Sequence, residues 1–330
     1  MKSMFHGAWL KLLISSFVVI SIASPSVAAD YPSKSIKMII PFAPGGASDF
    51  IGRILAVKLG EILGQQIVID NRTGVAGNLG MEMAAKSAPD GYTIFLGNIG
   101  TSAINPALYP HLNINPLRDF IPVTQVADVP SALVANVDFP PKNTAELATY
   151  LKANPNKFNY ASPGSGSANR LEMEVFMKLV GSTMTHVPYK GGAGPAVVGL
   201  IGTDTQLMFT TLPSVKQFMI AGKVKSYGVT STTRQPGLPN VPTMLEQGYP
   251  DLVTGSWQCI FVPVGTPPAI VNQLFIAITK ALDSAEIKEK ISNGGANAVV
   301  SASPEAAKLF VATELTRWGK VVKESGATAD

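Results

Sequence analysis

The chain has 330 residues, of which 46% are hydrophobic and 15% are charged, so it is long enough to form two domains with buried cores. Its 26 basic and 22 acidic residues nearly balance, which argues against nucleic acid as a partner, because such binding calls for a clustered basic face. The single cysteine, Cys259, excludes an intrachain disulfide. Because Cys259 lies in a strand-like apolar run, we expect a buried and unreactive thiol.

The first 29 residues have the pattern of an export signal. Lys2 and Lys11 supply a basic start, and residues 12–23 form an apolar run that is too short to span a bilayer comfortably. Small residues at 27–29 follow, so we expect cleavage after Ala29 and a soluble, exported chain. A retained membrane anchor is the alternative.

Short apolar runs alternate with segments of helical length along the rest of the chain, which indicates an α/β protein with mostly parallel sheets. The run at 36–40 predicts a first strand, and a Pro/Gly turn leads from it into a helix over 50–63. Later strands are expected at 67–69, 92–96, 131–135, 158–161, 186–189, 206–209, 226–229 and 257–262. Later helices are expected at 79–88, 144–154, 170–180, 196–201, 214–221, 268–282, 285–292 and 304–323.

The strand–helix pattern starts again after a proline-rich region, which predicts a second domain. We place the crossing into it near residue 128 and the return near residue 253. The predicted domains are residues 30–127 with 253–330, and residues 128–252. Two crossing strands form a hinge, and hinged α/β domains commonly close around a ligand.

Two strand–turn–helix junctions are candidate anion sites. At each junction the first N–H groups of a helix are free and the positive end of the helix dipole points outward, so no basic side chain is needed. Asp49 is expected to hold the shape of the first junction rather than touch the ligand carboxylate directly. The candidate residues are Phe42, Ala43, Pro44, Gly45, Gly46, Ser48 and Asp49 at the first junction, Ser165, Gly166 and Ser167 at the second, and Thr101 and Ser102 in a loop after the third strand.

The sequence lacks the usual enzyme motifs. It has no Gly-x-Ser-x-Gly nucleophile elbow, no Lys in the first glycine turn and no complete dinucleotide fingerprint. His111, His186 and Cys259 show no metal-ligand spacing, and His186 lies in a strand where a structural role is expected. We therefore expect no catalytic residue, cofactor or metal, with an exported hydrolase as the alternative class.

The ordered motifs of the mature chain resemble those of the Bug family, the periplasmic solute-binding receptors of tripartite tricarboxylate transporters (TctC-like). They are Tyr31-Pro32, Ile39 to Asp49, Asn71-Arg72-x-Gly74, Asp90-Gly91-Tyr92-Thr93, Asn105 to Tyr109, Val187 to Gly191, Ala221-Gly222-Lys223, Val241 to Pro250 and Pro263-x-Gly265-Thr266-Pro267. The resemblance implies a type II periplasmic-binding-protein fold (Venus flytrap). It also implies that a di- or tricarboxylate or an aromatic acid is trapped between the domains of a monomer and delivered to a membrane permease. A periplasmic ligand sensor would use the same closing cleft and remains the alternative.

Two positions depart from the family pattern: Arg170 replaces a usual histidine, and Gln206 replaces a usual acidic residue. Both changes make the predicted cleft more positive. Arg170 is expected either to bind a second carboxylate of the ligand or to form a salt bridge with Glu174 along the helix. The remaining predicted ligand contacts are Tyr189, Gln206 and Thr210, whereas Trp257 lies either in the cleft or in the core.

Overall fold

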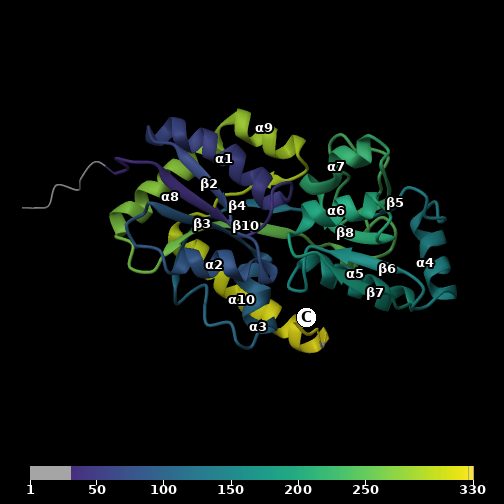
Figure 1. The fold of residues 1–330 in the computed structure, drawn as a ribbon. Coiled ribbons are helices and arrows are strands. Elements are labelled where there is room, and N and C mark those ends of the chain that lie inside the picture. The colour runs from purple at the N-terminus through teal and green to yellow at the C-terminus, as the bar shows by residue number, and fades with distance from the viewer. Residues whose placement is uncertain (1–30, 326, 330) are drawn as a thin grey trace, which may run out of the picture. The chain divides into compact units, whose positions relative to one another are not determined.

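The computed structural model describes residues 31–325 and 327–329 (Figure 1). The predicted export signal and its cleavage site after Ala29 lie outside these residues. In the part of the chain that is described, none of the helices combines the length and apolar character needed to cross a membrane.

Two mixed β-sheets form the framework of the described residues from Pro32 onward. The first sheet has the strand order β11-β4-β10-β3-β1-β2 and the second has the order β7-β6-β8-β5-β9. The first contains β1 (Ile36–Ile40), β2 (Ile67–Asn71), β3 (Thr93–Asn98), β4 (Phe120–Val129), β10 (Ser256–Pro263) and β11 (Asn297–Ala298). The second contains β5 (Ser131–Asn136), β6 (Asn159–Ser162), β7 (Thr185–Pro188), β8 (Leu207–Thr211) and β9 (Val224–Val229).

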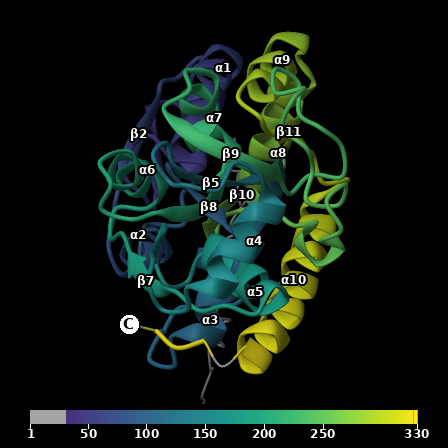
Figure 2. The same ribbon diagram turned by 90° about the vertical axis from the view of Figure 1, so that its right-hand side faces the viewer.

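Helices cover both faces of each sheet. Figure 1 shows α1, α8 and α9 on one face of the first sheet and α2, α3 and α10 on the other, while the side view of Figure 2 separates α4 and α5 from α6 and α7 around the second sheet. The helices are α1 (Ala47–Leu63), α2 (Asn78–Ala85), α3 (Asn105–Leu108), α4 (Thr144–Ala153), α5 (Ala168–Val180), α6 (Ala193–Ile201), α7 (Leu212–Ile220), α8 (Pro268–Asp283), α9 (Ala285–Asn293) and α10 (Pro304–Ser325). Short turns of helix are η1 (Val75–Gly77), η2 (Gly100–Ile104) and η3 (Pro250–Leu252).

The chain passes between the sheets at two places. Only Pro130 separates β4 of the first sheet from β5 of the second, and residues 230–255 lead back from β9 to β10. This arrangement is compatible with crossings near 128 and 253, and the division into domains at those residues stays a prediction.

The prediction of mostly parallel sheets is correct only in part. The strands of the β–α–β units pair in parallel, as β1 does with β2 and β3. The strands next to the crossings pair antiparallel: β10 with β3 and β4, and β5 with β8 and β9. A strand that enters a sheet from the other sheet is not bound by the right-handed β–α–β rule, which is why periodicity alone misses its direction.

Some predicted helix starts are a few residues late, and one predicted loop is helical. α1 begins at Ala47 rather than 50, and α5 begins at Ala168 rather than 170. The segment around Thr101 and Ser102 forms the π-helical turn η2, which runs directly into α3. The proline of this segment, Pro106, lies in the first turn of α3, where a missing N–H costs no hydrogen bond.

Large buried side chains stabilise each sheet from both faces. In the first sheet Phe95, Phe120 and Phe261 form an aromatic cluster with centroid distances of 5.4–6.0 Å. Trp257 belongs to the same core and donates its Nε1–H to Glu314 at 2.8 Å, which favours the core alternative for this residue. Cys259 is fully buried in this sheet, as predicted, and burial raises the pKa of its thiol far above the usual value.

Candidate functional site

The junction between β1 and α1 forms one wall of a cavity. The N-cap residue Gly46 has extended backbone (φ −90°, ψ 171°) and provides no side-chain cap for the helix. The first N–H groups of α1 therefore have neither an intrahelical acceptor nor a capping side chain. Gly46, Ala47 and Ser48 line the cavity at this end of the helix. The geometry leaves a positive helix end facing the cavity.

Asp49 fixes the shape of this junction from outside the cavity. Its carboxylate accepts hydrogen bonds from Gly45 N (3.2 Å), Arg53 Nε (2.9 Å) and Asn71 Nδ2 (3.2 Å). Burial acts to raise the pKa of Asp49, but the hydrogen bonds from Arg53, Gly45 and Asn71 outweigh burial and hold it below its usual value. The Asn71 amide also donates to Phe42 O at 2.8 Å, so the loop is tied to the strand beside it.

The junction between β6 and α5 forms the opposite wall. Ser167 is the N-cap of α5, and its Oγ accepts the Arg170 N–H at 3.3 Å. Gly166, Ser167, Ala168 and Asn169 line the same cavity as the start of α1. Two helix N-termini, one from the side of each sheet, thus open onto one space.

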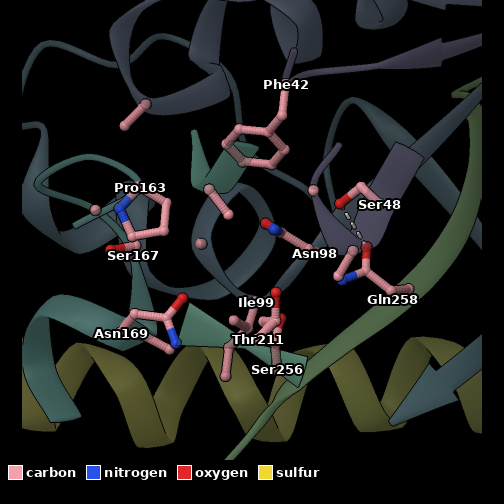
Figure 3. Close-up of a pocket in the computed structure, with 17 residues that line it drawn as sticks. Phe42, Ser48, Asn98, Ile99, Pro163, Ser167, Asn169, Thr211, Ser256 and Gln258 are labelled. Carbon is pink, nitrogen blue, oxygen red and sulfur yellow. Dashed lines mark hydrogen bonds between the residues drawn. The ribbon is translucent and has the colours of Figure 1, made fainter. Parts of the chain in front are cut away.

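Carboxamides and hydroxyls complete the lining, as Figure 3 shows. Ser48 Oγ donates to Gln258 Oε1 at 2.8 Å, and Asn98 Oδ1 accepts the Thr101 N–H at 3.1 Å. Thr211 ends strand β8, and its hydroxyl is hydrogen-bonded to Ser214 Oγ at 2.8 Å. The remaining lining residues are Phe42, Ala76, Ile99, Gly100, Pro163, Ala193 and Ser256.

The cavity is uncharged apart from its helix ends. The empty space between its walls is about 550 Å³ when the open solvent at its mouth is counted. Among the described residues that line it, none carries an ionisable side chain. A bound anion would therefore be stabilised by backbone N–H groups, amides and helix dipoles rather than by a salt bridge.

The structure brings together some of the predicted site residues and separates others. Phe42, Gly46, Ser48, Gly166 and Ser167 line the cavity. The predicted residues that do not line it are Ala43, Pro44, Gly45, Asp49, Thr101, Ser102, Ser165, Arg170, Tyr189, Gln206 and Thr210. Some of these residues contact the lining residues instead of the cavity. Thr101, for example, exchanges hydrogen bonds with the lining residue Asn98.

Arg170 occupies the salt-bridge position rather than the ligand-facing one. Its Nε donates to Glu174 Oε1 at 2.8 Å, and its Nη1 donates to Thr328 O at 2.8 Å and Ser165 O at 3.4 Å. All three acceptors lie outside the cavity lining. The helical i,i+4 spacing to Glu174 explains this placement.

Gln206 and Tyr189 also point elsewhere. Gln206 Oε1 accepts the Asn159 N–H at 2.9 Å, and the residue borders a separate surface hollow beside Phe139. Tyr189 packs against Gly199, and burial together with Asp204 raises the pKa of its hydroxyl.

Sequence reasoning missed Asn98, Asn169, Thr211 and Gln258. Asn98 and Thr211 are the last residues of β3 and β8, so the rule that ligands lie beyond strand ends could have found them. Asn169 is the second residue of α5, which was predicted to start later. Gln258 lies inside β10, and no sequence signal shows that this strand passes beside the α1 junction.

Direct contacts close the cavity between the two sheets. Ala43 N donates to Gly191 O at 3.0 Å, joining the β1–α1 loop to the loop after β7. Across the other side, a Cβ on Gly100 would lie only 2.9 Å from Gly166 O, so backbone meets backbone there. Lys216 on α7 donates to Asn293 O, at the end of α9, at 2.8 Å. These contacts describe a closed arrangement.

The catalytic alternative finds no support in the geometry. Ser162 Oγ and His186 Nε2 are hydrogen-bonded at 2.6 Å, but Ser162 is fully buried and lies outside the cavity lining. In the described residues, no cluster of His, Cys, Asp and Glu has the arrangement of a metal site.

Comparison with known proteins gives the same family along nearly the whole chain. The sequence profile of the tripartite tricarboxylate transporter family receptor matches residues 51–327. Protein BugT of Bordetella pertussis is 38% identical over 93% of this chain and 94% of its own. The solved structure of the periplasmic binding protein BugD is 35% identical, with a TM-score of 0.86 over 91% of this chain and all of that chain. A protein of R. palustris solved with adipate is 34% identical, with a TM-score of 0.87 over 91% of this chain and 100% of that one.

Proposed function

The chain belongs to the tripartite tricarboxylate transporter receptor family, and on this basis we propose that it captures a small carboxylate in the cavity between its two sheets. Relatives in this family are periplasmic binding proteins, and one has been solved with a dicarboxylate, adipate. The protein acts by binding and release, without a chemical step.

One observation carries the proposal: the N-termini of α1 and α5 open onto a single cavity whose described lining has no ionisable side chain. Such an arrangement favours an anion over a neutral molecule, because the free N–H groups and helix dipoles need negative charge opposite them. Each charge-assisted hydrogen bond contributes about 1.5–3 kcal/mol, so a few of them support micromolar binding after the cost of association.

The proposed ligand contacts are those predicted residues that line the cavity together with four polar residues found there. The set is Phe42, Gly46, Ser48, Asn98, Gly166, Ser167, Asn169, Thr211 and Gln258. Arg170 supports the second wall by its bond to Ser165 O and does not contact the ligand.

Opening and closing about the two crossing segments would admit and trap the acid. The closed form is then the one that a membrane permease of the tripartite type recognises, and the ligand is delivered when the receptor opens on it. Export through the predicted signal, with cleavage after Ala29, places the receptor in the periplasm beside that permease.

A thermal-shift and calorimetry screen tests the proposal. Purified exported protein is exposed to adipate and other dicarboxylates, tricarboxylates and aromatic acids, each beside its neutral methyl ester. A specific acid at one hundred times its Kd should stabilise the fold by about 2.7 kcal/mol, whereas its ester should have no effect. Equal binding of esters and acids, or binding of none of the acids, would overturn the proposal.

A further inference from the structure

The three carboxamides of the cavity are held in fixed orientations by their hydrogen bonds. Gln258 accepts Ser48 Oγ–H through its oxygen, and Asn98 accepts the Thr101 N–H through its oxygen. Both therefore have their NH₂ groups left for the cavity, on the side of the first sheet. These amides add donors to the N–H groups of α1.

Asn169 is oriented the opposite way. Its Nδ2 donates to Ser131 Oγ at 2.9 Å and to Glu172 Oε2 at 2.8 Å, which uses both hydrogens of the NH₂ group. The side chain is only 5% exposed, and in Figure 3 its oxygen is turned toward the cavity while its nitrogen points away. The carboxamide oxygen is therefore an acceptor facing the ligand.

Glu172 is the group that holds Asn169 in this orientation. It is 3% exposed, and its second oxygen, Oε1, accepts Thr254 Oγ–H at 2.7 Å. Ser131 begins β5 and Thr254 lies in the returning segment, so the anchor of Asn169 is attached to both crossings between the sheets. Thr230 ties the same two segments together, since its Oγ1 accepts the Ser131 N–H at 2.8 Å and donates to Thr254 O at 2.8 Å.

The carboxamides of the cavity are thus polarised: those on the side of the first sheet offer donors, and the one on the side of the second sheet offers an acceptor beside the N–H groups of α5. A carboxylate satisfies the donors, but a second carboxylate or a bare methylene placed opposite Asn169 Oδ1 would leave that buried oxygen without a hydrogen bond. A hydroxyl, ammonium or amide N–H on the ligand would satisfy it.

We propose that Asn169, positioned by Glu172, makes this receptor selective for organic acids that carry a hydrogen-bond donor beside the carboxylate, such as hydroxy or amino acids. The inference rests on the proposed function and narrows its ligand class. Asn169 is the residue that contacts the ligand, and Glu172 is a positioning residue that acts through it.

Matched acids test the inference. Calorimetry would compare adipate with 2-hydroxyadipate and 2-aminoadipate, succinate with malate and aspartate, and propionate with lactate and alanine. In the native protein the tightest acid should carry the donor and should bind at least about tenfold more tightly than its unsubstituted parent.

Two variants and one control locate the effect. In Asn169→Leu the preference for the substituted acid over its unsubstituted parent should fall to within about twofold, because the acceptor opposite the donor is removed. Glu172→Met should lose the preference in the same way by releasing the Asn169 amide, and it carries the test if Asn169→Leu does not fold. Glu174→Gln lies on the same helix outside the cavity and should retain the native preference.

Each outcome decides between the two proposals. Parents that bind as tightly as their hydroxy and amino derivatives, or a preference that survives in the folded variants, would overturn the selectivity while leaving carboxylate capture intact. A failure of every acid in every series to bind would overturn the proposed function, and the selectivity with it.

Discussion

Two buried carboxylates near the cavity respond to their surroundings in opposite directions. Burial raises the pKa of Glu172, and hydrogen bonds from Thr254, Asn169 and Ser131 offset this only in part. The pKa of Asp49 is lowered instead, because it faces the Arg53 guanidinium and two further N–H donors. The difference follows from the partners, since hydroxyls and amides compensate a buried charge less well than a cation does.

The raised pKa of Glu172 predicts a pH-dependent cost to stability. The folded state keeps the proton to higher pH than the unfolded chain, so the free energy of unfolding falls as pH rises from the ordinary value of 4.5 through the folded pKa. Glu172→Gln stays neutral and does not lose stability in this way. The free energy of unfolding of the variant should therefore rise relative to that of the native protein over this range, by about 1.4 kcal/mol for each unit by which the folded pKa of Glu172 exceeds its unfolded pKa. Urea unfolding of both proteins between pH 4 and pH 8, a range of about four units, measures this gain.

Asp49→Asn should show the opposite pH dependence of stability. The lowered pKa of Asp49 stabilises the native protein above the pKa of the unfolded chain. The variant should therefore be less stable than the native protein by about 1 kcal/mol at neutral pH, and this difference should shrink as the solution is acidified. For each variant, the difference in unfolding free energy from the native protein is plotted against pH. Slopes of the same sign for both variants would contradict the opposite pKa shifts of Glu172 and Asp49.

The contact between the β1–α1 loop and the start of α6 depends on a glycine. A Cβ on Gly194 would lie 2.6 Å from Pro44 O, a backbone atom that cannot move aside alone. Gly194→Ala should therefore disfavour the closed arrangement and weaken ligand binding by about 1–3 kcal/mol. The stability without ligand should change little, because the open form relieves the clash.

Gly319→Ala provides the control for this substitution. Gly319 lies in α10 with no atom within 4 Å of its added Cβ, so affinity should stay native and helix propensity should favour alanine. Calorimetry with the acid that binds the native protein most tightly measures the affinity of Gly194→Ala and of Gly319→Ala. Native affinity in Gly194→Ala would show that closure does not pass through this contact.

The strand–turn–helix junctions could be predicted because each is local: apolar strand, Pro/Gly turn and helix follow one another in the sequence. This is why the sequence predicts Phe42, Ser48 and Ser167, which line the cavity. The position of Gln258 depends instead on where β10 inserts between β3 and β4, a long-range pairing that periodicity does not encode. Arg170 was ambiguous for a related reason, since its partner Thr328 lies at the far end of the chain.

The two α/β halves could be inferred from the repeating pattern, but the direction of the strands beside the crossings could not. Those strands matter to the function because they carry cavity residues such as Ser256 and Gln258 as well as the anchor Ser131. The proposed ligand contacts and the proposed hinge are therefore built from the same segments, so we expect occupation of the cavity to favour the closed arrangement.

The central claim is that backbone N–H groups from two helices, one beside each sheet, hold the ligand's charge. Proline at the first helical position removes one N–H while its ring suits the start of a helix. Ala47 and Ala168 occupy this position in α1 and α5, and both follow residues with the extended backbone that proline requires. Ala285 occupies it in α9, away from the cavity, and also follows an extended residue.

The decisive measurement is the Kd of the tightest acid for Ala47→Pro, Ala168→Pro and Ala285→Pro, with thermal unfolding to verify that each variant is folded. Loss of one charge-assisted hydrogen bond should raise the Kd by about tenfold or more in both Ala47→Pro and Ala168→Pro, and leave it native in Ala285→Pro. Native affinity in folded Ala47→Pro and Ala168→Pro would contradict the claim.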